Sequence, residues 1–152
     1  MIEKIIIASD HAGFALKEKL KVCLEDKGFQ VKDAGTHSQE RCDYPQFASS
    51  AAKAVSKGSY KRGILICKSG IGNSIVANKF PGVRAALCYN VKAARLSRQH
   101  NDSNILVMGA AFVNLKLAKR IVAVWFDTGF AGGRYRRRIR QIEKIEKAIR
   151  GS

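Results

Sequence analysis

The sequence predicts an α/β domain built on a doubly wound, Rossmann-like parallel sheet of five strands. The chain has 152 residues, about the size of one ordinary domain, and 46% of them are hydrophobic. Short apolar runs alternate with longer amphipathic stretches, which is typical of crossover units that join parallel strands. Two prolines and the absence of repeats or low-complexity stretches leave no obvious linker. We therefore expect a single domain over residues 1–152, closed by a C-terminal helix.

Five apolar runs predict the strands of this sheet. The first of them, Ile5-Ile6-Ile7-Ala8, is unbroken and mostly β-branched, as expected of a strand that is buried on both faces. The run Gly63-Ile64-Leu65-Ile66-Cys67 has the same character. The expected strands are residues 5–8, 29–32, 63–67, 84–88 and 105–108.

Apolar residues recur with helical spacing between these strands. After the first strand they form one stripe, and Gly28 ends that helix at the position that glycine favours. The stripe consists of Leu16, Leu20, Cys23 and Leu24. Pro45 opens the second helix, as proline often does in a first turn. The expected helices are residues 14–27, 45–57, 72–80, 91–97, 115–126 and 134–150, and polar loops are expected at residues 35–44 and 98–102.

Composition argues against several classes of protein. No run approaches the roughly 18 consecutive apolar residues of a membrane span, and the start of the chain lacks the features of a signal peptide. The four cysteines lie far apart, with no Cys-x-x-Cys pair. This spacing favours reduced thiols and disfavours a disulfide framework or a zinc site. We therefore expect a cytoplasmic protein with no metal and no membrane partner.

The chain is strongly basic. It has 28 Lys and Arg residues against 12 Asp and Glu residues, for a net charge of +16. Residues 1–75 have a net charge of +4 and residues 76–152 a net charge of +12. Such an excess indicates an anionic partner, which could be nucleic acid, an acidic membrane surface or a phosphorylated small molecule.

The segment after the third expected strand carries the clearest chemical signal. Cys67 ends this strand, and a glycine-containing turn then leads into a helix. Backbone N–H groups in such a turn can hold an anion or a developing oxyanion, and a thiolate is favoured near a helix N-terminus. Cys67 is therefore a candidate reactive thiol. The alternative is a buried structural cysteine before a tight turn.

Two histidines lie in segments that could serve a site. Asp10 and His11 follow the first strand, where they could do acid–base work or hold an anion; alternatively, Asp10 caps the next helix and His11 is a surface residue. His100 precedes the last strand, in an expected loop. It could act as an acid near neutral pH or be a solvated loop residue.

The last helix places two arginines on its apolar side. At about 100° per residue, Ile142, Ile145 and Ile149 form a stripe that is expected to be buried. Arg134 and Arg138 fall on the same side, where a charge that faces a packed surface needs a partner. A bound anion such as phosphate would serve both guanidiniums; the alternative is a pair of interface salt bridges. The other basic residues of this helix are expected on a solvated outer face.

Five stretches cover nearly the whole chain in a specific order. They are SDHAGF at 9–14, DAGTHSQERCDYPQFA at 33–48, GILICKSGIGNSIVANKFPGVRAAL at 63–87, ARLSRQHND at 94–102 and GGRYRRRI at 132–139. Together they resemble the ribose-5-phosphate isomerase B family, also called the RpiB/LacAB sugar-phosphate isomerases. This family interconverts an aldose 5- or 6-phosphate and its ketose without a metal. The resemblance therefore implies a sugar-phosphate substrate and no cofactor.

The resemblance assigns the proton transfer to the turn after the third strand. Cys67 matches the base of the family, which moves a proton between C2 and C1 through a cis-enediol. Ser69 stands at a position that is Ser or Thr in the family, within the stretch that holds the enediolate. That stretch consists of Lys68, Ser69, Gly70, Ile71 and Gly72.

The resemblance assigns the other roles to separate segments. His100 matches the acid that opens the furanose ring, and Asn101 matches its substrate-binding neighbour. Asp10 matches the aspartate near the ring oxygen and O1, and Tyr44 matches a tyrosine that lines the site. The phosphate clamp of the family corresponds to His11, Arg134 and Arg138.

The resemblance also implies an assembly. In the family the site lies between two subunits, and the residues that match His100 and Asn101 come from the other chain. We therefore expect a homodimer with shared active sites, in which the C-terminal helix is used for dimerisation. In many members of the family, the dimer pairs again into a tetramer.

The sequence departs from the family pattern in three places. Lys68 replaces the first glycine of the usual Cys-Gly-Thr-Gly-Ile-Gly or Cys-Gly-Ser-Gly-Ile-Gly. A lysine would strain the turn if that glycine needs positive φ; otherwise it adds a cation beside Cys67. Ala111 and Asn114 replace the arginine and the last glycine of Gly-x-Arg-x-x-Gly, so a substrate-side cation is absent there. Tyr135 replaces a frequent histidine.

Ribose 5-phosphate is the favoured substrate on this resemblance, with allose 6-phosphate and galactose 6-phosphate as alternatives. A second class, a basic nucleic-acid-binding protein, is supported by the charge and by the run RYRRRIR. No aromatic stacking pattern, helix-turn-helix or RNA-binding signature accompanies that run, so nucleic acid is a disfavoured partner. The retained site residues argue against a third class, a non-catalytic paralogue.

Overall fold

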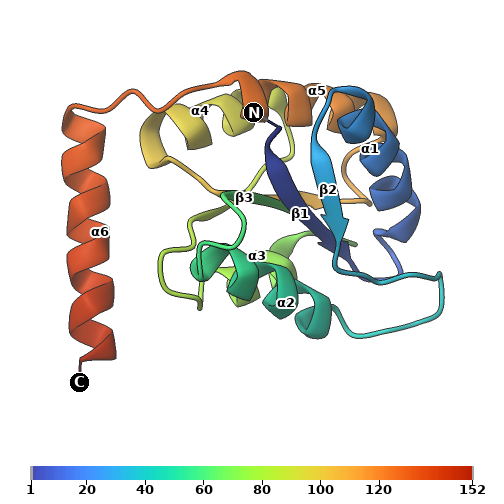
Figure 1. The fold of residues 1–152 in the computed structure, drawn as a ribbon, viewed down its shortest axis with the longest axis horizontal. Coiled ribbons are helices and arrows are strands. Elements are labelled where there is room, and N and C mark those ends of the chain that lie inside the picture. Colours follow the sequence, from blue (N-terminus) through green and yellow to red (C-terminus); the bar gives the residue numbers. More distant parts are fainter. Residues whose placement is uncertain (1, 152) are drawn as a thin grey trace.

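Five parallel strands form a single sheet with β3 at its centre. The computed structural model, drawn in Figure 1, describes residues 2–151. The strand order is β2-β1-β3-β5-β4, and all neighbouring pairs are parallel. The strands are β1 (Lys4–Ser9), β2 (Gln30–Asp33), β3 (Arg62–Cys67), β4 (Ala85–Leu87) and β5 (Ile105–Gly109). The predicted Rossmann-like sheet is confirmed, and each strand ends within one residue of its expected limit.

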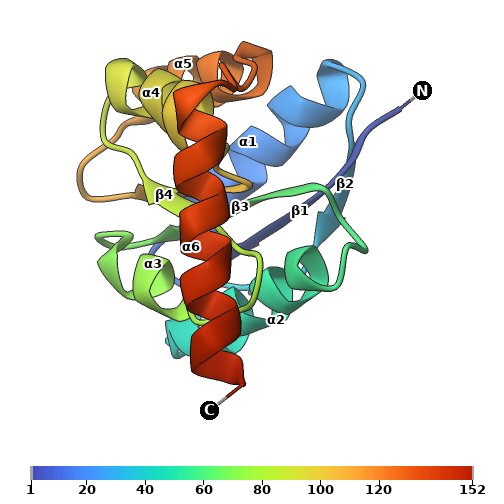
Figure 2. The ribbon, with the colours of Figure 1, turned by 90° about the vertical axis from the view of Figure 1, so that its left-hand side faces the viewer.

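Helices cover both faces of this sheet, as Figures 1 and 2 show. Three of them pack on one face (α1, α4 and α5) and two on the other (α2 and α3). Because side chains alternate along a strand, Ile5 and Ile7 of β1 contact the first layer and Ile6 contacts the second. The helices are α1 (Phe14–Asp26), α2 (Tyr44–Ser56), α3 (Ile71–Ala77), α4 (Val91–Asn101), α5 (Leu115–Asp127) and α6 (Arg134–Arg150).

Helix α4 is longer than the sequence pattern predicts. The expected loop at residues 98–102 is wrong, because the helix continues to Asn101 and His100 lies in its last turn. Asp102 ends the helix in the left-handed conformation, with φ of 46°. This carboxylate also accepts a hydrogen bond from Arg98, one turn earlier, at 2.9 Å. In the opposite sense, α3 is shorter than expected and ends at Ala77.

The last helix stands away from the sheet. Figure 1 shows α6 upright at one side of the domain, connected by an extended segment after α5, and Figure 2 shows it in front of β4. The prediction of a buried isoleucine stripe is wrong for the single chain, because Ile142 is 50% exposed, Ile145 60% and Ile149 69%. Only Ile139 of α6 is buried among the described residues. The glycines that precede α6 have positive φ, which lets the chain turn away from the body.

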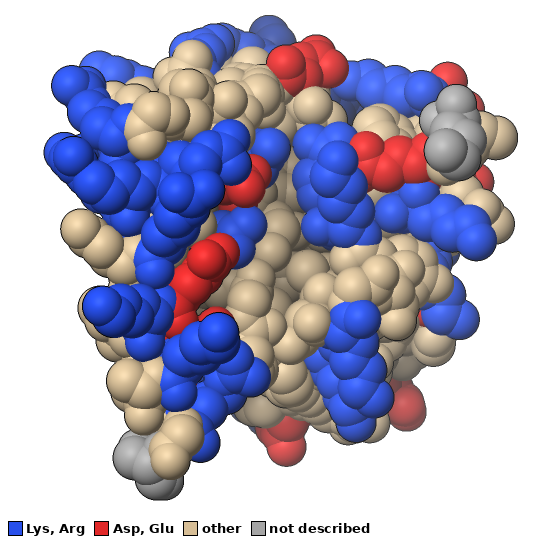
Figure 3. Space-filling model, turned by 60° about the vertical axis from the view of Figure 1, so that its left-hand side comes forward, with Lys and Arg blue, Asp and Glu red and all other residues tan. Residues whose placement is uncertain are grey.

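A groove separates α6 from the edge of the sheet. It has a volume of about 720 Å³ and lies between the isoleucine stripe and residues near β4, including Val83 and Ala85. Figure 3 shows it as a largely uncharged hollow beside a column of Lys and Arg side chains on α6. The Gly82 N–H donates to Glu146 Oε1 at 2.9 Å across it. None of the helices in residues 2–151 is long and apolar enough to cross a membrane.

Candidate active site

The predicted site residues form two clusters. The cysteine cluster lies at the carboxyl ends of β1 and β3 and comprises Asp10, His11, Tyr44 and Cys67 with the turn residues Lys68, Ser69, Gly70, Ile71 and Gly72. The histidine–arginine cluster lies at the end of α4 and the start of α6 and comprises His100, Asn101, Arg134, Tyr135 and Arg138.

The sheet keeps the two clusters apart. Cys67 is paired with Gly109, at the carboxyl end of β5. His100 belongs to α4, which ends just before Ile105 opens that same strand. The five residues of β5, at about 3.3 Å each, therefore span roughly 16 Å between the two edges. A single chain does not bring His100, Asn101, Arg134 or Arg138 to Cys67.

The turn after β3 holds the sulfur of Cys67 in place. Cys67 is 4% exposed, and its Sγ accepts a hydrogen bond from the Gly70 N–H at 3.1 Å. Gly70 has φ of 84°, a conformation that glycine adopts without strain. The Ile71 N–H donates to Ser69 Oγ at 3.1 Å. The next N–H groups of α3 have no acceptor within the helix, so they are available to an oxyanion.

Neighbouring segments fix the same turn from outside. The Ala110 and Ala111 N–H groups donate to the carbonyl oxygens of Cys67 and Lys68, both at 2.9 Å. The Tyr89 hydroxyl donates to the Ser69 carbonyl oxygen at 2.7 Å. A methyl group at Gly109 would overlap the Ser69 backbone, so glycine is required there. Contacts from these segments of the same chain therefore hold the turn in place.

Lys68 fits this turn without strain. Asp102 is the only non-glycine residue with positive φ in residues 2–151, so Lys68 does not occupy a conformation that requires glycine. Its side chain is exposed. The departure from the family pattern therefore adds a cation next to Cys67 at no conformational cost.

Asp10 lies beside Cys67 because β1 and β3 are paired. Its backbone N–H donates to the Ile66 carbonyl oxygen at 3.3 Å. Asp10 is 6% exposed, and its Oδ1 accepts the Gly13 N–H at 3.0 Å. Gly13 is the N-cap of α1, so the alternative prediction that Asp10 caps this helix is wrong. A side chain at Gly13 would come within 2.6 Å of the Ile66 oxygen, which explains the close approach of α1.

His11 and Tyr44 close the open side of the cysteine cluster. His11 Nδ1 lies 3.2 Å from both the backbone nitrogen and the carbonyl oxygen of Cys42, so its proton position depends on the tautomer. Tyr44 is 37% exposed, and its ring packs on Gly72, where a side chain would overlap it. His11 is thus held against the Cys42 backbone, and Tyr44 lies at the exposed side of the turn.

Two residues near the turn are not singled out by the sequence pattern. Asn73 is 1% exposed, and its Oδ1 has no hydrogen-bond partner within residues 2–151. Its signal in the sequence is a polar residue on the same side as Ala77 in a mostly apolar helix. Tyr89, which fixes the Ser69 carbonyl, lies in the polar segment after β4 and gives no comparable signal.

The histidine–arginine cluster is built around an aromatic stack. The rings of His100 and Tyr135 lie 4.2 Å apart and nearly parallel, at 9°. Arg134 Nη2 donates to the Tyr135 hydroxyl at 2.9 Å, and Arg138 lies 5.7 Å from the Tyr135 ring centroid. Both arginines are exposed, and neither makes an ion pair in the described part of the chain. The cluster therefore presents an imidazole and two unneutralised guanidiniums on one surface.

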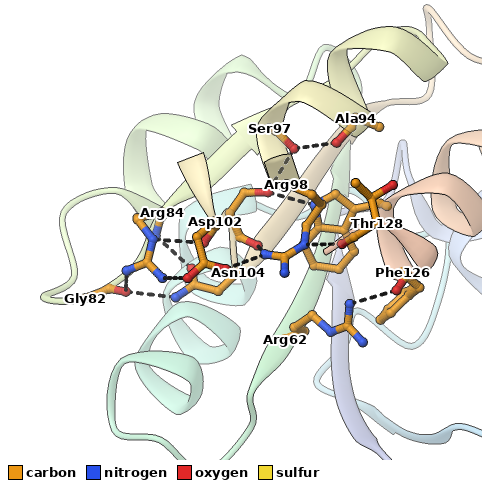
Figure 4. Close-up of polar contacts among 12 residues, drawn as sticks. Arg62, Gly82, Arg84, Ala94, Ser97, Arg98, Asp102, Asn104, Phe126 and Thr128 are labelled. Carbon is orange, nitrogen blue, oxygen red and sulfur yellow. Dashed lines mark hydrogen bonds and ion pairs between the residues drawn. The ribbon is translucent and has the colours of Figure 1, made fainter. Parts of the chain in front are cut away.

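An ion-pair network positions the end of α4 that carries His100. Asp102 lies between two arginines, with Arg84 Nη2 at 3.3 Å and Arg98 Nη1 at 2.9 Å (Figure 4). Arg98 also donates from Nε to the Thr128 carbonyl oxygen at 3.2 Å. These bonds join α4, the segment before β4 and the end of α5. His100 is therefore held by the body of the chain, although it faces away from Cys67.

Comparisons with known proteins identify relatives along almost the whole chain. The Ribose/Galactose Isomerase family model matches residues 5–142. Ribose-5-phosphate isomerase B of Escherichia coli is 47% identical over 96% of this chain and 98% of its own. Among solved structures, a Clostridium thermocellum ribose-5-phosphate isomerase B is 49% identical, with a TM-score of 0.94 over 96% of this chain and 99% of that one.

A third relative is solved with a sugar phosphate. Ribose-5-phosphate isomerase B of Mycoplasma genitalium, with bound ribulose-5-phosphate, is 42% identical and has a TM-score of 0.93. The match covers 97% of this chain and 98% of that one. Both the sequence and the fold therefore agree along almost the full length, and this chain belongs to the Ribose/Galactose Isomerase family.

Proposed function

We propose that this protein is an aldose–ketose isomerase that interconverts ribose 5-phosphate and ribulose 5-phosphate. The observation that carries the proposal is the Cys67 turn, in which the thiol accepts the Gly70 N–H at the same sheet edge as Asp10. Relatives at 47% and 37% identity are named for this activity, and the M. genitalium relative binds its ketose product.

In this proposal Cys67 is the base. The thiolate takes the proton from C2 of the open-chain aldose, and the electron pair of that bond forms the double bond of the cis-enediol. The electron pair of the C1 carbonyl moves to O1 in this step. The O2 hydroxyl then gives its proton to O1 and forms the C2 carbonyl, while the electron pair of the C1–C2 double bond takes the proton back from the Cys67 thiol at C1. Backbone N–H groups after Ser69 stabilise the developing oxyanion. Asp10 lies near the ring oxygen and O1, and no cofactor takes part.

His100 is the acid that opens the furanose ring, and it comes from the second subunit. Because the sheet separates His100 from Cys67, one chain alone leaves each site incomplete. A twofold dimer solves this, since the same contact then brings two pairs of clusters together. Asn101 contacts substrate, and Arg134 and Arg138 of the same cluster join His11 around the phosphate.

The exposed apolar residues support a second copy as the partner. Of nine large hydrophobic residues that are exposed in residues 2–151, seven lie in two patches. One patch surrounds the cysteine cluster and the other lies on α6; they consist of Tyr44, Ile71, Ile75 and Phe112, and of Ile142, Ile145 and Ile149. Two such patches on one chain suit a self-complementary interface. The proposal places α6 in this interface, with a tetramer as a further step and the cytoplasm as the site of action.

A coupled assay with purified protein tests the function. We expect conversion of ribose 5-phosphate, and a loss of about a thousandfold in Cys67→Ala, because a positioned base contributes on this scale. Cys88→Ala is the matched control, since burial raises the pKa of the Cys88 thiol to about 11 and keeps it protonated. Wild-type activity in Cys67→Ala would overturn the role of Cys67. Conversion of allose 6-phosphate or galactose 6-phosphate alone would reassign the substrate.

A further inference from the structure

Lys68 is a cation whose side chain is free at the mouth of the cysteine cluster. It follows Cys67 directly and is exposed. Its ammonium makes no hydrogen bond or ion pair within residues 2–151. Its backbone is nevertheless fixed, because its carbonyl oxygen accepts the Ala111 N–H at 2.9 Å. The side chain therefore starts from a rigid point and is not occupied elsewhere in the chain.

The surroundings of the turn make this cation stand out. The segments that contact the turn are Tyr44, residues 87–89 and residues 108–111, and residues 10–13 contact Ile66 just before it. None of these segments contains Lys or Arg. They do contain the Asp10 carboxylate, which is 6% exposed. A sugar phosphate adds close to two negative charges at neutral pH. Without Lys68, this half of the site would present a buried anion to an anionic substrate.

Position 111 explains why a lysine at position 68 is useful. Ala111 stands where the family commonly has an arginine. The hydrogen bond between residues 68 and 111 makes their side chains leave the backbone from neighbouring points. A cation at position 68 therefore starts from the same part of the turn as a cation at position 111.

We propose that the Lys68 ammonium binds the phosphate group of the substrate, in place of a cation at position 111. This inference rests on the proposed function and adds a binding residue to it. Lysine acts on phosphate as a flexible point charge, and an exposed, mobile ammonium suits substrate capture. The fixed backbone N–H groups of the turn are better placed to stabilise the developing oxyanion. Lys68 therefore lowers KM and leaves kcat nearly unchanged.

The test compares the two ends of one strand. Lys68 follows β3 and Lys61 precedes it, and both are exposed lysines. In Lys68→Met we expect KM for ribose 5-phosphate to rise about tenfold, as for loss of one hydrogen bond to a charged group, with kcat within about twofold. The inhibition constant of inorganic phosphate should rise in parallel. In Lys61→Met, which removes the same charge at the opposite edge, both constants should stay within about twofold of wild type.

A second substitution tests whether a cation at position 111 can replace the cation at position 68. In the double variant Lys68→Met, Ala111→Arg, we expect KM and phosphate inhibition to return towards the wild-type values. An unchanged KM in Lys68→Met, a fall in kcat alone, or no recovery in the double variant would overturn the inference. Wild-type protein that does not convert ribose 5-phosphate would instead refute the proposed function. Phosphate inhibition, measured with whichever sugar phosphate is converted, would still test Lys68.

Discussion

The cysteine cluster and the histidine–arginine cluster differ in how far one chain completes them. In the first, Cys67 and Asp10 are buried, and the turn between β3 and α3 is hydrogen-bonded on several sides. In the second, His100 is half-buried against Tyr135, while Arg134 and Arg138 extend into solvent. The difference shows that the fold preforms the cysteine cluster and presents the histidine–arginine cluster outward. In the proposed function these are the two halves of one site.

Sheet topology is the cause of this difference. Parallel strands bring the segments after β1, β3 and β5 to one edge, where they pack against one another. Helix α4 runs back to the other edge, so its last turn is exposed there. The second cluster therefore has surface groups without a counterpart in its own chain. A second copy that supplies the counterpart would complete both clusters at once.

Outside the proposed catalytic residues, the largest expected effect comes from the surface that would join the two clusters. In the double variant Ile142→Asp, Ile145→Asp, we expect a monomer whose activity is reduced about a hundredfold or more, because each site loses the acid of the other subunit. The fold should survive, since these side chains are 50% and 60% exposed. Light scattering coupled to gel filtration gives the mass, and the isomerase assay gives the activity.

Val22→Asp is the matched control for this surface. Val22 is a 59% exposed apolar residue on α1, away from both clusters. We expect this variant to keep the wild-type mass and activity. A double isoleucine variant that remains dimeric and fully active would contradict the assignment of α6 to the interface.

A smaller effect is expected from the preformed half. Lys17 is fully buried and donates to Asp33 Oδ2 at 2.6 Å, and the Gly35 N–H donates to Asp33 Oδ1 at 2.9 Å. The Gly35 and Thr36 backbones then bond to Ser9, just before Asp10. Asp33→Asn leaves Lys17 with Glu18 as its remaining anion, at 3.1 Å. We expect a loss of about 2 kcal/mol in the free energy of unfolding, measured in urea at pH 7.

The pH dependence of stability checks the same ion pair. Burial by itself raises the pKa of Asp33, but hydrogen bonds from Lys17 and Lys21 outweigh it and hold this pKa below its usual value. A carboxyl group whose pKa is lowered in the folded state contributes stability above its unfolded pKa of about 4. This contribution is lost as the pH falls through the folded pKa. The free energy of unfolding of wild type should therefore fall in acid by this contribution. Asp33→Asn lacks the carboxyl group, so its free energy of unfolding should not show this fall. Glu40→Gln, which removes an exposed carboxylate, is the control.

The sequence pattern predicts the preformed half better than the outward half. Alternation of apolar runs locates the strands, and therefore the edge at which Asp10 and Cys67 meet. The end of α4 could not be predicted in the same way, because Asp102 is held by Arg84 from another segment. The isoleucine stripe of α6 identifies an apolar face but not what covers it. Contacts across the sheet, such as Tyr89 with Ser69, leave no local pattern in the sequence.

Lys68 is a further example of what the sequence predicts and what only the structure shows. The sequence shows that lysine replaces a glycine, and both strain and an added charge are then reasonable interpretations. The backbone conformation distinguishes them, since positive φ occurs at Asp102 and at glycines but not at position 68 in the described chain. The hydrogen bond to Ala111 adds a relation between two positions that are far apart in the sequence.

Subunit complementation tests the shared site most directly. Cys67→Ala and His100→Gln should each be nearly inactive alone, because every site lacks one of the two groups. When the two variants are unfolded and refolded together, half of the dimers are mixed, and each mixed dimer has one intact site. We therefore predict recovery to about a quarter of wild-type activity at equal amounts. No recovery, in a mixture shown to contain mixed dimers, would contradict a site shared between two chains.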